Sequence, residues 1–197
     1  MQALAEHYIT EDEYWALEAG SDIKHEYFDG CIFSRPGGSP EHNRLAANAV
    51  ISLGSQLRGT PCRAVGSDQR VKVEATGLNT YSDVVVYCRP WRFDPREKNT
   101  LLNPVVLIEV LSDSTADYDR TIKFDHYKQI ESLRDYILIA QDRVRVEHFH
   151  RTATGSIASP RLWGYRSPST ASAAPCHSPS FTRTSNCLMS HDRSAPV

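Results

Sequence analysis

The 197-residue sequence has no apolar run long enough to cross a membrane, and its N-terminus has no hydrophobic segment like that of a signal peptide. Its five cysteines are scattered, odd in number and without a Cys-x-x-Cys pair, which argues against a disulfide framework and a zinc ribbon. The formal net charge is only −2, so no basic excess marks a nucleic-acid-binding protein. A nuclease need not be basic overall, because its phosphate contacts are local. We therefore expect a soluble protein of the reducing cytoplasm with no membrane partner.

Length and composition are those of one globular domain, with 40% hydrophobic and 23% charged residues. The character of the chain changes after Arg151, where serine and proline accumulate, lysine is absent and hydrophobic periodicity is lost. We expect a single domain over residues 1–151, divided into an N-terminal part (1–36) and a core (37–151). Residues 152–197 are predicted to be a low-complexity tail, disordered or read out of frame in a GC-rich gene.

Local signals predict the first elements. Thr10 and Glu13 have capping-box spacing at the start of a short helix. Residues 24–34 alternate around Asp29-Gly30, which is typical of a β-hairpin. Ser39-Pro40 then begins a second helix, with serine as N-cap and proline in the first turn.

Apolar patterning predicts the remaining elements. The expected order after the hairpin is α-β-β-β-α-β-β, which indicates an α/β fold with a mixed central β-sheet flanked by helices. The strands are expected at 62–73, 83–87, 105–111, 136–140 and 144–149, and the second core helix at 116–130.

Two carboxylates stand out in this pattern. Glu109 lies in the middle of an apolar strand, on the same face as Leu107 and Leu111, where a charge is costly unless it is paired or bound to a metal. The alternative is a buried structural salt bridge. Asp83 opens the preceding strand and alone would be a turn residue. Together they offer hard oxygen ligands of the kind that suit Mg²⁺ or Mn²⁺.

Lys123 is the third candidate. Helical spacing places it with Tyr127 and Ile130 on the face toward the sheet, where lysine is unusual. Its ammonium could orient an attacking water or neutralise charge on a phosphate. The alternative is a lysine whose stem packs while its head reaches water.

Several other polar residues have two interpretations each. Glu26 in the hairpin is either a further metal ligand or an exposed strand carboxylate. His42, in the first turn of the second helix, is expected to be a packing histidine, with a role in the site as the second interpretation. His148 and His150 share one face of a polar strand, where we expect them to be solvated.

Asp83, Glu109 and Lys123 resemble the PD-(D/E)XK nuclease signature. The surrounding sequence is more specific and resembles the Uma2-type family of endonucleases over residues 10–151. The resemblance is carried by Thr10-Glu11-Asp12-Glu13-Tyr14, Lys24-His25-Glu26-Tyr27-Phe28-Asp29-Gly30, Ser39-Pro40-Glu41-His42-Asn43, Ser82-Asp83-Val84-Val85-Val86, Pro104 to Ser112 and Lys123-Phe124-Asp125-His126-Tyr127.

The resemblance implies a restriction-endonuclease-like core and metal-dependent hydrolysis of DNA. Asp83 and Glu109 would hold the metal, with the carbonyl of Val110 as a further ligand. The family pattern has proline where this chain has Ser82. The lysine of the general signature, expected two residues after Glu109, would have moved to Lys123. A recognisable C-terminal strand after residue 151 is missing.

The sequence thus predicts an endonuclease that uses Mg²⁺ or Mn²⁺ and has DNA as its partner. Asp83, Glu109 and Lys123 would be catalytic, and Glu26 and His42 would support them. The alternative is a catalytically inactive module that binds nucleic acid or protein on the same fold. A homodimer is compatible with either function, because many folds of this type work as dimers.

Overall fold

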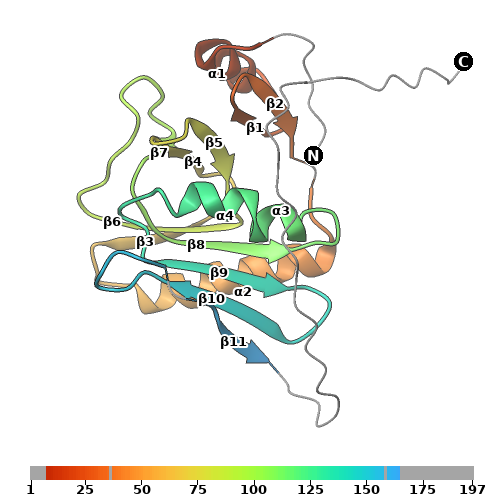
Figure 1. The fold of residues 1–197 in the computed structure, drawn as a ribbon, viewed down its shortest axis with the longest axis vertical. Helices are drawn as coiled ribbons and strands as arrows, with labels where there is room; N and C mark the ends of the chain where they lie inside the picture. Colours follow the sequence, from red (N-terminus) through yellow and green to blue (C-terminus); the bar gives the residue numbers. More distant parts are fainter. Residues whose placement is uncertain (1–7, 36, 158, 165–197) are drawn as a thin grey trace, which may run out of the picture.

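The structure is a computed structural model that describes residues 8–35, 37–157 and 159–164. Two β-sheets and four helices make up this part of the chain (Figure 1). The helices are α1 (Glu11–Ala19), α2 (Pro40–Gln56), α3 (Ala116–Arg120) and α4 (Ile122–Tyr127). No described helix is both long and apolar enough to cross a membrane.

The larger sheet has six strands in the order β11-β10-β9-β8-β6-β3. Its central strands β8 and β9 are parallel, whereas the other neighbours are antiparallel, so the sheet is mixed as predicted. The strands are β3 (Cys62–Gly66), β6 (Val84–Cys88), β8 (Pro104–Leu111), β9 (Asp135–Ala140), β10 (Arg145–His150) and β11 (Arg161–Gly164).

The smaller sheet joins the N-terminal hairpin to the core. Its order is β2-β1-β5-β4-β7, and Tyr27 of β1 pairs with Asn79 of β5. The strands are β1 (His25–Phe28), β2 (Cys31–Ser34), β4 (Arg70–Val73), β5 (Leu78–Tyr81) and β7 (Thr100–Leu101). This pairing makes the hairpin part of the domain, so Glu26 can reach residues of the larger sheet.

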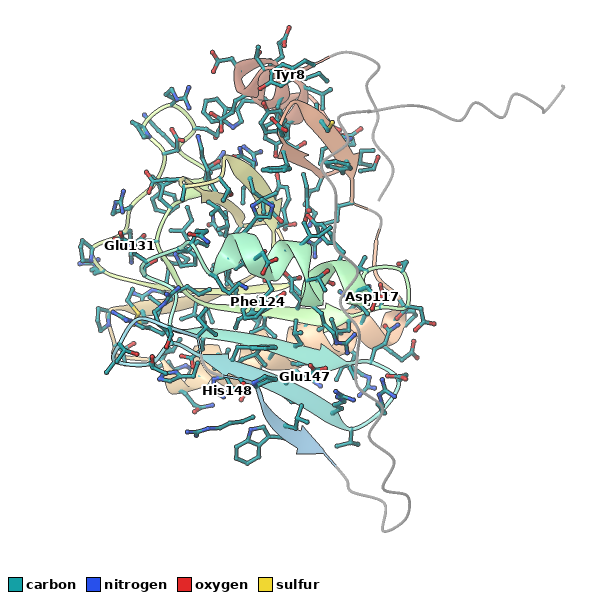
Figure 2. The ribbon with its side chains drawn as sticks, in the orientation of Figure 1. Tyr8, Asp117, Phe124, Glu131, Glu147 and His148 are labelled. Atoms are coloured by element: carbon teal, nitrogen blue, oxygen red, sulfur yellow. A yellow bond between two sulfur atoms is a disulfide. The ribbon has the colours of Figure 1, made fainter. Side chains whose placement is uncertain are left out.

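The main hydrophobic core lies between the two sheets and under α4, which crosses one face of β8 and β9 (Figure 1). Phe124 of α4, labelled in Figure 2, points toward the larger sheet and stacks on Tyr136 of β9, with ring centroids 5.1 Å apart. The buried members of the core are Val71, Val73, Leu78, Val85, Leu101, Leu107, Leu111, Tyr127, Ile130, Leu133, Tyr136 and Leu138. Packing of α4 in this position directs Lys123 toward the middle of β8.

The predicted local signals are confirmed. Thr10 and Glu13 form the capping box of α1. Asp29 and Gly30 take positive φ values of 46° and 77° at the hairpin turn, where glycine adopts the left-handed conformation without a steric penalty. The Ser39 side chain accepts a hydrogen bond from the backbone of His42 and caps α2.

Two predicted elements are divided in the structure. Residues 62–73 form two strands rather than one, because a turn at 67–69 sends β3 and β4 into different sheets. The strand β5 was not predicted; it returns from β4 through a tight turn at Gly77, whose φ is +78°. The helix expected at 116–130 is broken at Thr121, where φ is −116° and ψ is −86°.

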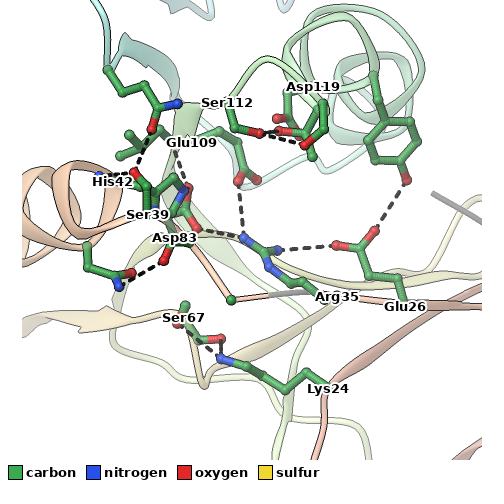
Figure 3. A pocket seen from close by; sticks show the side chains of 18 of the residues that line it. Lys24, Glu26, Arg35, Ser39, His42, Ser67, Asp83, Glu109, Ser112 and Asp119 are labelled. Atoms are coloured by element: carbon green, nitrogen blue, oxygen red, sulfur yellow. Dashed lines mark hydrogen bonds and ion pairs between the residues drawn. The ribbon is translucent and has the colours of Figure 1, made fainter.

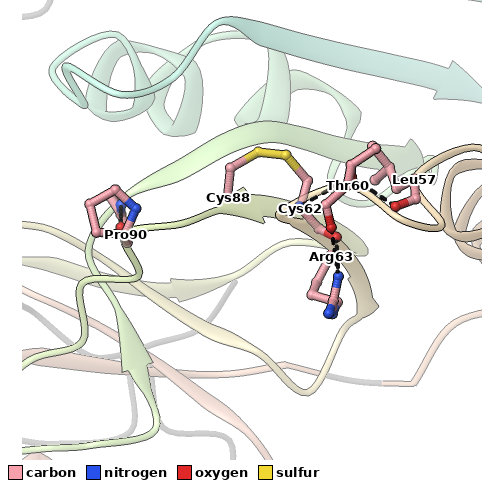
Figure 4. Close-up of a disulfide and its surroundings, with 7 residues drawn as sticks. Leu57, Thr60, Cys62, Arg63, Cys88 and Pro90 are labelled. Atoms are coloured by element: carbon pink, nitrogen blue, oxygen red, sulfur yellow. Dashed lines mark hydrogen bonds between the residues drawn. A yellow bond between two sulfur atoms is a disulfide. The ribbon is translucent and has the colours of Figure 1, made fainter.

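The cysteine pattern led to a wrong expectation, since Cys62 and Cys88 form a disulfide (Figure 4). The two residues are 26 positions apart in the sequence, and spacing alone did not indicate a pair. Antiparallel pairing of β3 with β6 places them directly opposite each other, with Cα atoms 3.9 Å apart.

The described residues after 151 include regular structure, which the sequence did not predict there. Arg151 makes a bridge with Ile157, and residues 161–164 form β11, which pairs with β10. The C-terminal strand expected to be missing is therefore present, and it covers the edge of β10. The remainder of the predicted tail, 165–197, lies outside the described residues.

Candidate functional site

A cavity of about 610 Å³ opens where the N-terminal hairpin, the start of α2, the adjoining ends of β6 and β8, and the α3–α4 segment meet (Figure 3). All six residues that the sequence singled out for catalysis, support or metal binding line it. They are Glu26, His42, Asp83, Glu109, Val110 and Lys123.

Arg35 lies at the centre of this cavity and was missed by the sequence analysis. Its guanidinium reaches between Glu26 on one side and Asp83 and Glu109 on the other (Figure 3). The N···O distances are 3.2 Å to Glu26, 2.6 Å to Asp83 and 3.8 Å to Glu109, and the guanidinium also donates to the carbonyl of Tyr81. The only signal was a basic residue directly after a strand, which is common at protein surfaces.

Asp83 is held just before β6 by neighbours from three elements. Its Oδ2 accepts a hydrogen bond of 2.7 Å from the backbone N–H of Val110 and lies 3.0 Å from Nε2 of His42. Burial alone would raise the pKa of Asp83, but the hydrogen bond from His42 and the charge of Arg35 outweigh it and hold the pKa at about 2. Asp83 is therefore a carboxylate throughout the physiological pH range.

Glu109 has a different environment in the middle of β8. Strand alternation turns it toward α4, where Tyr127 donates a hydrogen bond of 3.1 Å and Nζ of Lys123 lies 3.0 Å away. Burial raises the pKa of Glu109 to about 7 despite the neighbouring ammonium, and the charge of Asp83 acts in the same direction. The carboxylate form of Glu109 is thus less favoured than that of Asp83, whose pKa is lowered.

Lys123 is 2% exposed, so it does not reach bulk water as a snorkelling lysine would. Burial would lower the pKa of its ammonium, but Glu109 and Glu26 raise it above the ordinary value. The ammonium also donates a hydrogen bond of 2.9 Å to the carbonyl of Tyr81 and lies 3.8 Å from Asp119. It is therefore a fixed cation at the base of the cavity.

Glu26 and His42 belong to the same cluster. Glu26 is buried and accepts hydrogen bonds from Thr80 at 2.8 Å and from Lys123 at 3.3 Å. Its burial excludes the interpretation of Glu26 as an exposed carboxylate of the strand. The contact between His42 and Asp83 favours the site role over the packing role that we expected for this histidine. The hydrogen bond from His42 to Asp83 raises the pKa of the imidazole.

Asp119 and Tyr118 were also missed. Asp119 is buried and its pKa is raised by burial, while the Tyr118 hydroxyl donates to Glu26 at 3.4 Å. Asp119 precedes Lys123 by four residues, and this spacing in the helix predicted at 116–130 was the available signal for a carboxylate beside that lysine.

The cluster carries an excess of acidic groups. Four buried carboxyl groups, those of Glu26, Asp83, Glu109 and Asp119, surround two permanent cations, Arg35 and Lys123. The raised pKa values of Glu109 and Asp119 follow from burial and from this imbalance. A site of this kind can accept additional positive charge.

The fold has a counterpart among solved structures. The structure is similar to the crystal structure of "a putative nuclease belonging to DUF820" from Anabaena variabilis, with a TM-score of 0.65 over 80% of this chain and 85% of that chain. At 20% sequence identity this likeness shows the fold alone, a restriction-endonuclease-like α/β core.

The sequence comparisons identify the family. A model of the Uma2 family, described as "putative restriction endonuclease", matches residues 11–177. Two uncharacterised proteins of Synechocystis sp. strain PCC 6803 are also similar: one is 33% identical over 150 residues, covering 75% of this chain and 76% of the relative. The other is 32% identical over 143 residues, covering 73% and 81%. The chain belongs to the Uma2 family, as its motifs indicated.

Proposed function

We propose that this protein is a divalent-metal-dependent endonuclease that hydrolyses phosphodiester bonds of DNA with Mg²⁺ or Mn²⁺. The observation that supports it best is the convergence of three buried carboxyl groups, from Glu26, Asp83 and Glu109, with a buried lysine on one open cavity. Family membership supports nuclease activity at a coarse level.

The donor set fits a hard divalent cation. The carboxyl groups offer oxygen ligands, and the four buried acids of the cluster outnumber its two permanent cations. The guanidinium of Arg35 contacts the carboxyl groups of Glu26, Asp83 and Glu109, so it marks a position between them where a positive charge is stabilised. In the proposal Asp83 and Glu109 would hold the metal, with the backbone of Val110 as a further ligand and Glu26 in support.

A bound Mg²⁺ would activate a water molecule, polarise the scissile phosphate and stabilise the leaving oxygen. Side chains of the cavity would stabilise charge on the phosphate and orient the metal ligands. Lys123 would stabilise negative charge on the phosphate from its fixed position beside Glu109. His42 orients Asp83 through the 3.0 Å contact, and the Tyr127 hydroxyl orients Glu109.

We extend the proposal to assembly and location. A homodimer would supply two such cavities, one for each strand of a duplex. A cytoplasmic location would give the protein access to DNA. These two statements rest on the proposed activity.

The test compares the wild-type chain with Asp83→Asn and with Asp142→Asn, a matched change on the exposed β9–β10 turn. Each protein is incubated with supercoiled plasmid and with single-stranded DNA in Mg²⁺, Mn²⁺ or EDTA, and Mn²⁺ binding is measured by calorimetry. We expect metal-dependent cleavage by the wild type and by Asp142→Asn, and loss of cleavage and of Mn²⁺ binding in Asp83→Asn.

Two results would contradict the proposal. Equal cleavage by the wild type and Asp83→Asn would remove Asp83 from the reaction. Binding of DNA without cleavage in any metal would identify the inactive binding module instead.

A further inference from the structure

A second cluster of metal-ligating groups lies on β9 and β10, away from the cavity. His148 and His150 are two residues apart on β10 and therefore share one face of the strand. Asp135 is directly opposite His150 on β9. Its Oδ1 lies 2.6 Å from Nε2 of His148 and 2.7 Å from Nδ1 of His150. All three donor atoms lie within 4.8 Å of one another.

This triad, Asp135, His148 and His150, is on the opposite face of the sheet from the carboxylate cluster. Tyr136 and Leu138 of β9 are buried in the core under α4, so alternation turns Asp135 to the other face. Parallel pairing aligns Asp135 with Val106 of β8, three residues before Glu109. The two groups are therefore separate sites.

The triad is accessible and held by rigid backbone. The side chains of Asp135, His148 and His150 are 24%, 29% and 54% exposed, so one side of the cluster faces solvent (Figure 2 labels His148). Arg151 follows His150 and fixes the end of β10 by donating hydrogen bonds of 2.7 to 3.0 Å to the carbonyls of three residues between α4 and β9. These are Lys128, Ile130 and Leu133.

The chemistry of these donors differs from that of the cavity. Two imidazoles and a carboxylate suit zinc and similar borderline cations, whereas all-oxygen sets suit Mg²⁺. Zinc–ligand bonds of about 2.0–2.2 Å place neighbouring donors roughly 3.3 Å apart in a tetrahedral site. The N···O distances of 2.6 and 2.7 Å therefore need to open by only a fraction of an ångström.

We propose that the triad binds one divalent cation of the zinc class through Nε2 of His148, Nδ1 of His150 and the carboxylate of Asp135. The fourth position is open to solvent. Because its ligands come from two neighbouring strands, the bound ion clamps β9 to β10. The proposal is independent of the nuclease function.

The experiment uses the full chain without a purification tag. Zinc affinity is measured by competition with a chromophoric chelator, and Co²⁺ is added as a spectroscopic probe of tetrahedral ligation. The wild type is compared with the double variant His148→Gln/His150→Gln and with His126→Gln, a histidine of α4 outside the triad. Asp83→Asn serves as the control for the carboxylate cavity.

We expect a zinc ion bound at the triad in the wild type, and this ion should be retained in the His126 and Asp83 variants even if a second ion binds in the carboxylate cavity. The double variant should lose at least about 100-fold in affinity, because outer-shell partners alone are worth 10- to 100-fold. Co²⁺ should give the intense visible bands of a tetrahedral site in the wild type only. The single variant His150→Gln changes the most exposed of the three ligands and should weaken zinc binding by itself. It tests the proposal if the double variant does not fold.

Zinc affinity that is equal in the wild type and both triad variants would overturn the proposal and place the ion elsewhere, for example on Cys176 or His177 outside the described residues. Absence of zinc binding in the wild type would overturn it as well.

Discussion

Replacing Arg35 with methionine tests the charge balance of the cavity. Methionine keeps much of the side-chain volume but removes the guanidinium that contacts Glu26, Asp83 and Glu109. Removal of one partner from a buried ion pair costs about 3–5 kcal/mol, and the 18% exposure of Arg35 favours the lower end. For a domain of this size, about 3 kcal/mol lowers the Tm by roughly 6–12 °C.

Thermal unfolding of the wild type, Arg35→Met and Arg44→Met measures this effect in EDTA and in Mn²⁺. Arg44 is an exposed arginine of α2, so its replacement controls for the loss of one positive charge. Mn²⁺ should raise the Tm of Arg35→Met more than that of the wild type. The ion restores the lost charge in the variant, whereas in the wild type it competes with the guanidinium.

Two results would refute this reasoning. If Arg35→Met unfolds at the wild-type temperature in EDTA, the carboxyl groups do not depend on the guanidinium for their charge balance. If Mn²⁺ shifts both proteins equally, Arg35 does not compete with the metal for these ligands.

Three further predictions concern other parts of the chain. Lys123→Met should reduce DNA cleavage by about 100- to 1,000-fold while Mn²⁺ binding measured by calorimetry persists; retained cleavage would make Lys123 a packing residue. Burial lowers the pKa of His126, so the neutral imidazole stabilises the fold above the unfolded pKa of about 6.5, and this contribution is lost as the pH falls below it. The Tm of the wild type should therefore fall relative to that of His126→Gln between pH 8 and pH 5. A constant difference in Tm would contradict the assignment. A chain ending at Arg151 should associate with increasing concentration in light scattering because the edge of β10 is uncovered, whereas one ending at Gly164 should associate less; equal association would exclude β11 as the protecting strand.

The sequence was most informative where a charged residue interrupts an apolar pattern. Glu109 in its strand and Lys123 on its helix face were recognisable because burial of a charge demands a partner, and the two residues are in fact partners. The capping and turn signals of the N-terminal segment depend on neighbours a few residues away, and these were also read correctly.

Features that depend on register between distant segments could not be predicted. Arg35 and Asp83 are 48 residues apart, and their contact arises from the way two sheets meet. The Cys62–Cys88 bridge depends on strand pairing that spacing does not encode. The split of residues 62–73 between two sheets depends on tertiary packing, since both halves have the alternating pattern of a single strand.

The position of the hairpin has a consequence for the order in which the chain folds. Glu26 emerges early during synthesis, but Thr80 follows 54 residues later and the Lys123 ammonium 97 residues later. Until then only Arg35, nine residues later in the chain, could pair with its carboxylate, and burial would leave the carboxylate without its hydrogen bonds from Thr80 and Lys123. We therefore expect the hairpin to dock late, after α4 has formed on the larger sheet, because contacts of such long sequence separation form slowly.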